Sequence, residues 1–363
     1  MHDRKKGMVF IMKKTRIAII GTGGIAGAHM VGYKALTDTV EVVAGCDLDE
    51  EKLNRFCDTH GIPGRYTDYN EMLAKEDIDA VSVTTWNAAH KGATIAALKA
   101  GCDVICEKPM AMNTAEALEM EKTAKETGRL LQIGFVRRYG GDTLSAKDYI
   151  DSGKMGELKL ARVGYERRNG CPGGWFGDIR YSGGGPLTDL GVHVMDLARY
   201  LAGRPTPVSA YGIIGYNADA QNVAASDWSV DTTGKFEHNC EDYAIGFIRF
   251  DNGFTIEVNT SFNLRLENRR NGVQLIGTKS GLELDNPSKF YTQEEDGTID
   301  SEGYPTCDFN GLFTAEIAHF IDCVRNGTEC IAPAHDGVVL MQMIDAIYES
   351  ARTGKEVAIK PLD

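Results

Sequence analysis

The feature that most restricts the possible folds is an apolar segment that runs directly into a glycine-rich sequence. Residues 16–20 read Arg-Ile-Ala-Ile-Ile, and residues 21–27 continue as Gly-Thr-Gly-Gly-Ile-Ala-Gly. The second stretch fits G-x-G-x-x-A at the start of a helix, where Gly21 permits a tight turn, Gly23 lets another group approach the backbone, and Ala26 lets helix and strand pack. The pattern predicts a strand–turn–helix unit in a parallel sheet.

Strand-like segments continue to alternate with helical ones until about residue 136. The expected strands cover residues 16–20, 40–44, 78–84, 103–106 and 130–135. Between the last two, Asn113 and Glu116 have the spacing of a helix N-cap and its reciprocal glutamate. Alternation of this kind predicts a doubly wound Rossmann fold, with a parallel sheet covered by helices.

The pattern changes after about residue 140, where longer strands with an alternation of period two follow one another. They are expected at residues 158–165, 208–214, 243–250, 254–258 and 273–277. The Asp-Asn-Gly sequence at 251–253 is typical of a hairpin turn between two of them. This half therefore predicts an open, mostly antiparallel sheet, followed by helices near residues 310–325 and 337–352.

Two domains of different type follow from these patterns. We expect an amino-terminal extension at residues 1–14, a Rossmann domain at 15–138, whose glycine-rich turn suits a dinucleotide such as NAD, and a second domain at 139–363, left for substrate binding and oligomerisation. Residues 218–239 are polar and lack periodicity, so they are expected to form a long loop. The predicted fold class is α/β plus α+β.

The composition excludes several classes of protein. The 52 acidic and 39 basic residues give a net charge of −13, which would repel a nucleic acid. No apolar run approaches the roughly 18 residues of a membrane helix, and the first residues lack the apolar core of a signal peptide. The nine cysteines are widely spaced, and neither they nor the histidines have the spacing of a zinc site. We expect a soluble, cytoplasmic protein with reduced cysteines and no metal.

Asp47, at the end of the second expected strand, indicates which dinucleotide the first domain binds. It follows Gly23 by 24 residues, close to the roughly 20 residues expected for a carboxylate that holds the adenosine ribose. Such a carboxylate accepts hydrogen bonds from the 2′-hydroxyl and repels a 2′-phosphate, and no arginine stands in residues 46–51. NAD is therefore favoured over NADP. Alternatively, Asp47 only caps the helix that begins near Asp49.

Two further motifs are more specific than the glycine pattern. The sequence Glu-Lys-Pro at 107–109 ends the fifth expected strand, and residues 183–196 read Gly-Gly-Gly-Pro-Leu-Thr-Asp-Leu-Gly-Val-His-Val-Met-Asp. Together with Thr-Trp-Asn-x-x-His at 85–90 and Gly-Phe-Val-Arg-Arg-Tyr at 134–139, they make the chain resemble the Gfo/Idh/MocA family. The resemblance covers about residues 15–359 and implies an NAD(P)-dependent enzyme that acts on sugars or polyols.

The resemblance implies three catalytic residues, Lys108, Asp189 and His193. Oxidation of a carbinol removes a proton from the hydroxyl as the hydride leaves, and histidine is suited to accept this proton near neutral pH. His193 is therefore the candidate base, while Lys108 stabilises the developing alkoxide. Asp189 stands four residues before His193, so on a helix it shares a face with the imidazole, which it can orient while it holds a substrate hydroxyl. The alternatives are a solvated lysine, a core histidine and a helix cap.

Further residues are expected to contact the cofactor or the substrate. Those expected to contact NAD are Gly21, Gly23, Gly24, Ile25, Ala26, Asp47, Thr85, Trp86, Asn87, His90, Glu107, Lys108 and Arg138. Those expected to contact the substrate are Arg168, Trp175, Phe176, Asp189 and His193. Arginine donors suit sugar hydroxyls and an indole suits the C–H face of a sugar ring, although an exposed loop with an anchoring tryptophan is the alternative. Trp86 stands where the family commonly has proline.

These features predict an NAD-dependent dehydrogenase with its active site between the two domains. The preferred substrate is a pyranose, free or as a glycoside, oxidised at a secondary hydroxyl, with carbon 3 and a 3-keto product as the best guess. The alternatives are an inositol dehydrogenase, an NAD-dependent glycoside hydrolase of the same fold, and a nucleotide-sensing regulator without catalysis. The presence of Lys108 favours a dehydrogenase over a hydrolase, because the related hydrolases tend to have another residue at this position. The open face of the second sheet predicts a homodimer or homotetramer.

Overall fold

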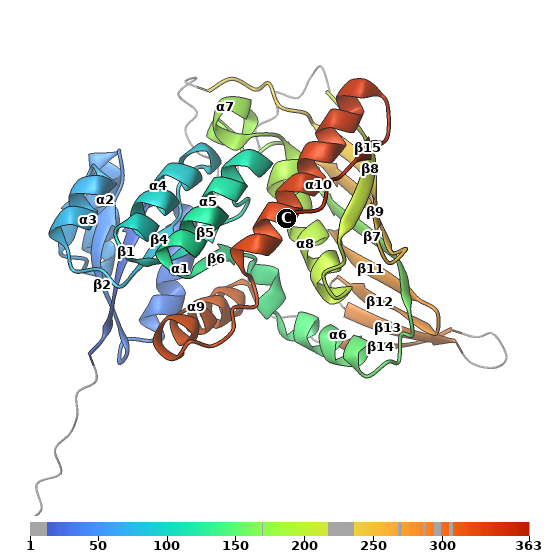
Figure 1. Ribbon diagram of the computed structural model, residues 1–363, viewed down its shortest axis with the longest axis horizontal. Helices are drawn as coiled ribbons and strands as arrows, with labels where there is room; N and C mark the ends of the chain where they lie inside the picture. The colour runs from blue at the N-terminus through green and yellow to red at the C-terminus, as the bar shows by residue number, and fades with distance from the viewer. Residues whose placement is uncertain are drawn as a thin grey trace, which may run out of the picture.

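The computed structural model describes residues 13–168, 170–216, 236–267, 271–285, 288–293, 299–304 and 308–362. Residues 1–12 of the expected extension and residues 218–235 of the expected loop lie outside the described residues. The described chain forms a six-stranded sheet and a nine-stranded sheet, with helices packed between and beside them (Figure 1).

The first sheet confirms the Rossmann prediction. Its strands are β1 (Thr15–Ile20), β2 (Val40–Cys46), β3 (Gly64–Tyr66), β4 (Ala80–Val83), β5 (Asp103–Glu107) and β6 (Leu131–Gly134). All pairs are parallel, and the order is β3-β2-β1-β4-β5-β6. The sequence analysis missed β3, because three residues are too short to show a pattern. The strand order reverses between β1 and β4, and in such sheets the ligand binds at the carboxyl ends of the strands on either side of this point.

Helices follow the strands of the first sheet as expected. They are α1 (Gly24–Lys34), α2 (Glu50–His60), α3 (Tyr69–Lys75), α4 (Asn87–Lys99) and α5 (Thr114–Thr127). The predicted cap of α5 is confirmed, because Asn113 Oδ1 accepts a hydrogen bond from Glu116 N at 3.0 Å. Since α1 begins directly after the glycine turn, its free backbone N–H groups lie at the carboxyl edge of the sheet.

The second sheet confirms the predicted open, mostly antiparallel architecture. Its strands are β7 (Leu158–Glu166), β8 (Pro207–Gly215), β9 (Tyr243–Phe250), β10 (Thr255–Ser261), β11 (Asn271–Gly277), β12 (Ser280–Leu284), β13 (Ser288–Gln293), β14 (Ile299–Tyr304) and β15 (Val357–Ala358). The order is β14-β13-β12-β11-β7-β10-β9-β8-β15, and only β7 and β10 pair in parallel. The expected hairpin joins β9 to β10, with Gly253 at a φ of +84°.

The described helices that pack on the second sheet cover one of its faces. They are α6 (Gly141–Asp151), α8 (Val192–Leu201) and α10 (Ala334–Thr353), with α10 packed against β8 and also against α5 of the first domain (Figure 1). The other face leaves large apolar side chains 36–47% exposed: Val208, Tyr211, Ile213, Phe247 and Ile276. This face therefore retains apolar surface that a partner can cover.

One helix near the carboxyl end of the chain completes the first domain. α9 (Phe309–Asn326) packs on α1, where Gly32 allows a close approach; a Cβ at this position would lie 2.6 Å from Ile317 Cβ. Ile317 and Phe320 share a buried cluster with Ile17 and Ile19 of β1. The Rossmann core is therefore built from both ends of the chain.

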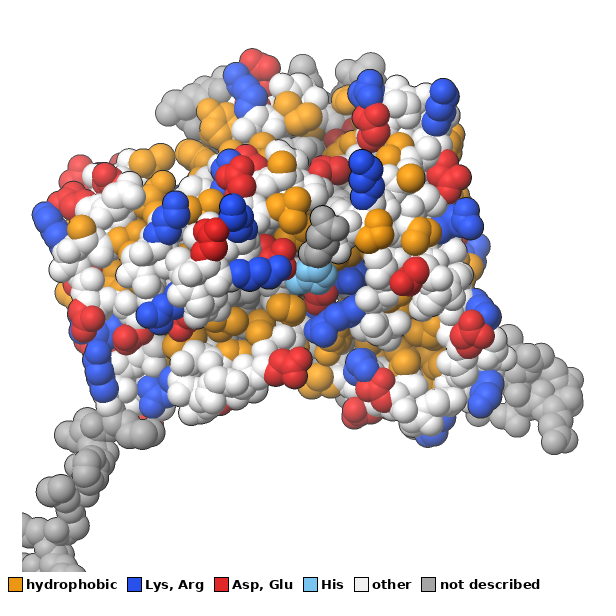
Figure 2. All heavy atoms as spheres, in the orientation of Figure 1, with side chains coloured by type: hydrophobic (Ala, Val, Ile, Leu, Met, Phe, Trp, Pro, Cys, Tyr) orange, Lys and Arg blue, Asp and Glu red, His pale blue; other side chains and the backbone are white. Residues whose placement is uncertain are grey.

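The outer helices carry the charge pattern of water-exposed surfaces. Figure 2 shows acidic and basic side chains interspersed over the face formed by α4, α5 and α10. Among the helices described, none combines the length and apolar character needed to cross a membrane. The eight cysteines within the described ranges are free thiols, and seven of them are buried.

Candidate active site

Two segments that lie far apart in the sequence bring Lys108 together with Asp189 and His193. Lys108 directly follows β5, Asp189 lies in the short π-helical turn η3 (Leu187–Gly191), and His193 lies in the first turn of α8. Lys108 Nζ donates to Asp189 Oδ1 at 3.2 Å and to Asp189 O at 3.1 Å. The group therefore lies where the second domain meets the carboxyl edge of the Rossmann sheet.

The turn that carries Lys108 is fixed on both sides. Lys108 N donates to Glu107 Oε2 at 3.1 Å, and Glu107 Oε1 lies 3.0 Å from His29 Nε2 on α1. On the other side, His90 Nδ1 lies 2.8 Å from Pro109 O, and His90 Nε2 lies 3.1 Å from Thr85 O. Glu107 and His90 were expected to contact NAD. In the structure both side chains form hydrogen bonds with other protein groups and thereby hold this turn in place.

The segment that carries Asp189 depends on two residues that the sequence analysis missed. Glu241 Oε2 accepts a hydrogen bond from Gly185 N at 2.8 Å, and Tyr348 Oη donates to Glu241 Oε1 at 2.8 Å. A Cβ at Gly184 would lie 2.1 Å from Tyr348 Oη. The glycine run before Asp189 is therefore required for this close packing, and no sequence signal links positions 241 and 348 to it.

His193 is a neutral base without a hydrogen-bond partner among the described residues. Burial, followed by the charges of Lys108, Arg137 and Arg167, holds the pKa of His193 well below its ordinary value. Its ring lies 6.1 Å from that of Tyr165. The expected orientation of the imidazole by Asp189 is wrong in this structure, because that carboxylate pairs with Lys108 instead. A neutral, unpaired imidazole can accept a proton from a substrate hydroxyl.

Two arginines lie on the ring of Tyr165 beside His193. The guanidinium carbons of Arg137 and Arg167 lie 5.0 Å and 5.8 Å from the ring centroid. Arg167 Nη1 also lies 3.5 Å from Asp189 Oδ2, a buried oxygen that accepts no hydrogen bond within the described chain. The predicted substrate residue Arg168 is exposed, since successive side chains of an extended segment point to opposite sides.

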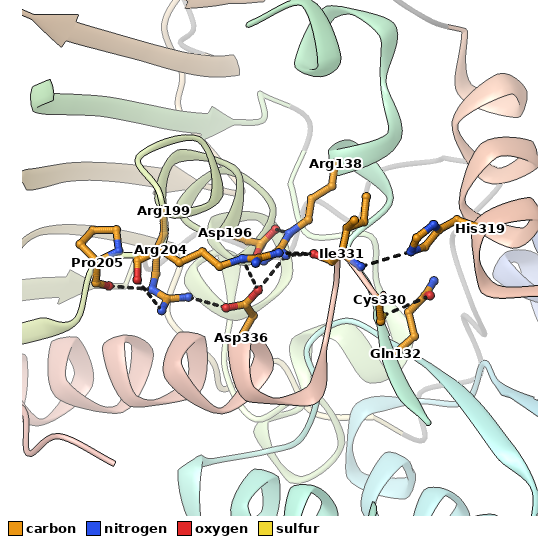
Figure 3. Close-up of polar contacts among 10 residues, drawn as sticks. All are labelled: Gln132, Arg138, Asp196, Arg199, Arg204, Pro205, His319, Cys330, Ile331 and Asp336. Atoms are coloured by element: carbon orange, nitrogen blue, oxygen red, sulfur yellow. Dashed lines mark hydrogen bonds and ion pairs between the residues drawn. The ribbon is translucent and has the colours of Figure 1, made fainter. Parts of the chain in front are cut away.

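Arg138 was expected to contact NAD, but the structure buries it at the domain junction. Its Nε donates to Asp196 Oδ2 at 2.9 Å, and its Nη1 donates to Asp336 Oδ2 at 2.8 Å and to Ile331 O (Figure 3). Arg199 Nη1 donates to the other oxygen of Asp336 at 2.8 Å. Arg138 therefore joins α8, α10 and the segment before α10, and it is not available to a ligand.

The glycine turn has the shape that a dinucleotide requires. Gly21 has a φ of +91°, and a Cβ there would lie 2.7 Å from the Thr84 backbone. Gly23 is extended, and a Cβ there would meet only Lys52 Nζ, at 3.7 Å. Gly24 and Ile25 begin α1, and Ala26, the next residue of this helix, is fully buried. Free N–H groups at the start of α1 therefore face open space beside Gly23, a suitable site for a pyrophosphate.

Asp47 lies beside this turn, as expected for the ribose carboxylate. Its Oδ2 accepts hydrogen bonds from Thr22 N at 2.7 Å and Thr22 Oγ1 at 2.9 Å, and it forms an ion pair with Lys52 Nζ at 3.1 Å. Burial raises its pKa, but Lys52 and the hydrogen bonds more than offset this, so the net pKa is lowered. The alternative that Asp47 caps α2 is wrong, because Asp49 caps this helix through Lys52 N at 3.0 Å.

The remaining predicted contacts lie where α4 meets the second domain. Asn87 Nδ2 donates to Ser182 O at 2.7 Å, and the Trp86 ring lies 5.4 Å from that of Tyr181. Trp175 and Phe176 stack on each other with centroids 4.0 Å apart. Asn87 therefore serves the domain contact together with the Trp86–Tyr181 pair, while Phe176 packs against the buried cluster that includes Leu190 of η3.

Comparison with known proteins agrees with this geometry. The family described as "Oxidoreductase family, NAD-binding Rossmann fold" matches residues 15–135, and its C-terminal alpha/beta domain matches residues 147–359. D-glucoside 3-dehydrogenase of Escherichia coli is 32% identical over 95% of this chain and 97% of its own. The scyllo-inositol 2-dehydrogenase (NAD(+)) of Bacillus subtilis is 27% identical over 95% of this chain and 96% of its own.

Solved structures share the fold. Aldose-aldose oxidoreductase from Caulobacter crescentus superposes with a TM-score of 0.79 at 26% identity, covering 95% of this chain and all of its own. Levoglucosan dehydrogenase in complex with NADH gives a TM-score of 0.85 at 21% identity, covering 96% of this chain and all of its own. Because both family domains match in order over most of the chain, the protein belongs to the Gfo/Idh/MocA family of oxidoreductases and carries its NAD-binding Rossmann domain.

Proposed function

We propose that this protein is a sugar dehydrogenase, which transfers a hydride between NAD and a secondary hydroxyl of a pyranose or pyranoside. The observation that carries the proposal is a neutral, unpaired His193 beside the ion pair of Lys108 and Asp189. Carbon 3 is the preferred position, with a 3-keto sugar as product. Similarity to D-glucoside 3-dehydrogenase over nearly the whole chain supports this choice.

In the proposed mechanism His193 removes the proton from the substrate hydroxyl as the adjacent C–H bond breaks. The Lys108 ammonium stabilises the alkoxide that develops, and no reorganisation is needed because Asp189 and the Glu107 turn already hold it. Asp189 Oδ2 accepts a hydrogen bond from a neighbouring sugar hydroxyl. When bound, NAD accepts the hydride at its nicotinamide ring.

The remaining residues bind and orient the two ligands. Gly23 and the start of α1 hold the pyrophosphate, and Asp47 holds the adenosine ribose. Arg137 donates to sugar hydroxyls, since its guanidinium forms no hydrogen bond or ion pair with the rest of the described chain. Trp175 supplies an apolar face for the sugar ring or its aglycone.

An inositol dehydrogenase is the second candidate, supported by the similarity to scyllo-inositol 2-dehydrogenase. An inositol also presents adjacent secondary hydroxyls to Asp189 and His193. The retained ion pair of Lys108 favours oxidation over the hydrolase alternative, and the complete catalytic group favours an enzyme over a nucleotide sensor.

The test is a substrate panel with a matched inactive control. The enzyme and NAD are incubated with glucosides, free hexoses and inositols, reduced nicotinamide is followed by absorbance, and products are identified by NMR. We expect turnover of pyranosides to 3-keto products, and none with His193→Asn. Turnover of inositols alone would reject the pyranoside in favour of the second candidate. Inactivity with every polyol would reject a sugar dehydrogenase.

We also propose that residues 139–363 mediate assembly into a homodimer or homotetramer. The exposed apolar face of β8 and β9, with Tyr211 and Phe247 at 44% and 47% exposure, is suited to a second copy of this chain. Analytical ultracentrifugation of the wild type and Phe247→Lys tests this, because the charge should dissociate the assembly. A cytoplasmic location is proposed as well, where free cysteines stay reduced.

A further inference from the structure

A buried polar cluster lies behind the turn that carries Lys108. It consists of His29 on α1, Glu107 at the end of β5 and Glu316 on α9, which are 0%, 5% and 0% exposed. One side-chain nitrogen or oxygen from each lies within 4.8 Å of those of the other two. Two carboxyl groups and one imidazole thus share a site with almost no water-exposed surface, an arrangement that needs an explanation.

A chain of hydrogen bonds links Tyr33 to Glu107 through Ser82 and His29. Tyr33 Oη lies 2.6 Å from Ser82 Oγ, Ser82 Oγ lies 3.1 Å from His29 Nδ1, and His29 Nε2 lies 3.0 Å from Glu107 Oε1. An ionised Glu107 only accepts, so Nε2 must carry a hydrogen. In the neutral ring Nδ1 then accepts from Ser82, which in turn accepts from Tyr33. The imidazole nitrogen that faces the cluster has no lone pair for a metal ion.

Glu316 is the part of the cluster that these hydrogen bonds leave unexplained. Both of its oxygens are buried, and neither has a hydrogen-bond partner in the described part of the chain. Two ionised carboxylates at this separation would repel each other strongly without water. Burial and then the charge of Glu107 raise the pKa of Glu316 well above its ordinary value.

We propose that Glu316 is a neutral carboxylic acid that donates a hydrogen bond to the Glu107 carboxylate, and that it thereby positions Lys108. The proposal requires the two carboxyl groups, which have one oxygen each within 4.8 Å of the other, to close to hydrogen-bond distance. Glu107 then accepts from Glu316 and His29 on one side and from Lys108 N on the other. The orientation of its carboxylate fixes the backbone from which the Lys108 ammonium projects.

The second oxygen of Glu316 also has a suitable neighbour. Tyr139, in the 3₁₀ turn η1 (Val136–Tyr139), has a buried hydroxyl without a partner in the described chain, and burial followed by the Glu316 charge raises its pKa. The titratable groups that face Glu316 are thus His29 and Tyr33 on α1, Glu107 on β5 and Tyr139 on η1. With a donor on one oxygen and an acceptor on the other, a neutral Glu316 can connect the Tyr139 hydroxyl at the domain junction to the Glu107 carboxylate at the Lys108 turn.

The protonation of Glu316 can be tested without any activity measurement. A group whose pKa is raised by folding stabilises the protein fully below its unfolded pKa of about 4.3, and this stabilisation declines as the pH rises toward the folded pKa. In that window each pH unit should raise the unfolding equilibrium constant of the wild type about tenfold relative to Glu316→Gln. Chemical unfolding at several pH values measures this, with the exposed Glu126→Gln as control.

Infrared difference spectra provide a second reading of the same proton. The wild type minus Glu316→Gln spectrum, recorded about one pH unit above the unfolded pKa of about 4.3, should contain the carbonyl stretch of a protonated carboxylic acid, which the Glu126→Gln control leaves unchanged. An unfolding equilibrium with the same pH dependence in wild type and Glu316→Gln would overturn the neutral acid. A divalent metal ion bound stoichiometrically to the purified wild type and absent from Glu316→Gln would also overturn the neutral acid.

The positioning role rests on the proposed function of Lys108 and is tested by comparing two variants. Glu316→Gln keeps a donor toward Glu107 and should retain kcat, whereas Glu316→Leu should lower kcat by about 10- to 100-fold without weakening NAD binding. Equal kcat values for the two variants would refute positioning. If Lys108→Ala left kcat unchanged, the proposed function would fail, while the unfolding and infrared results for Glu316 would still stand.

Discussion

Three glycines of the sequence at 21–27 have different surroundings, so alanine at each should give a different result. Gly21 has a φ of +91°, and a Cβ there would lie 2.7 Å from the backbone of Thr84, directly after β4. The left-handed conformation costs a residue with a Cβ about 1–2 kcal/mol, and forced overpacking costs about 1–3 kcal/mol. We therefore expect Gly21→Ala to lower the free energy of unfolding by roughly 2–5 kcal/mol.

Gly23→Ala should affect the ligand and not the fold. Gly23 has φ −78° and ψ −169°, values that alanine adopts readily, and its Cβ would contact only the flexible end of Lys52. The free energy of unfolding should change by less than about 0.5 kcal/mol. If a pyrophosphate approaches this backbone, the methyl group removes a charge-assisted hydrogen bond worth about 1.5–3 kcal/mol. NAD should then bind about 10- to 150-fold more weakly.

Gly27→Ala provides the matched control. Gly27 lies within α1, and no atom lies within 4 Å of its Cβ position. Alanine should therefore stabilise the helix by about 0.5–1 kcal/mol and leave NAD affinity unchanged. Denaturant unfolding and isothermal titration with NAD measure both quantities on the three variants. The reasoning is refuted if Gly23→Ala binds NAD as tightly as Gly27→Ala, or unfolds as easily as Gly21→Ala.

Three further predictions concern the base, the dinucleotide and the domain junction. Because burial and then nearby cations hold the pKa of His193 well below its ordinary value, kcat/KM should stay level as the pH falls through 6.5, and a decline centred there would contradict this. Asp47→Ser should shift the preference toward NADP in calorimetric titrations, since Lys52 Nζ, which lies 3.1 Å from Asp47 Oδ2, becomes free to pair with a 2′-phosphate. An unchanged preference for NAD would contradict the assignment of Asp47 as the ribose carboxylate. Arg138→Met should lower the free energy of unfolding by about 3–5 kcal/mol because it leaves the Asp196 carboxylate buried without its ion-pair partner, whereas the exposed Arg168→Met should unfold like the wild type.

Local patterns predicted the parts of this molecule that depend on neighbours in sequence. The alternation of strands and helices predicted the parallel sheet, and the Asp-Asn-Gly turn predicted the hairpin between β9 and β10, because each signal spans only a few residues. The three motif residues Lys108, Asp189 and His193 were expected together and lie together. Their catalytic roles stay predictions until the variants are assayed.

Adjacent arginines show where such reasoning fails. Arg137 and Arg138 have the same side chain one position apart, yet one lies at the catalytic group and the other is buried between α8 and α10. Arg167 likewise lies at the catalytic group, beside Asp189, whereas Arg168 is exposed. The backbone direction at each position decides which side chain faces the site, and composition carries no information about it.

Long-range packing is the second source of error. Glu241 and Tyr348 support the turn at Gly185, although they stand 56 and 163 positions after it in the sequence. Neither residue belongs to a local motif, and a buried glutamate resembles a surface one until its partners are known. The role of Lys52 at Asp47 was missed although it lies only five positions away, because lysine at a helix start is typical of exposed surface.

The packing of α9 on α1 has a consequence for synthesis on the ribosome. Gly32 emerges early, but Ile317, which covers it, follows about 285 residues later, and at 5–20 residues per second this takes roughly 15–60 s. During that time the nascent Rossmann domain presents an uncovered apolar surface on α1, a surface that chaperones recognise. Truncation before residue 309 would remove α9 and make this exposure permanent.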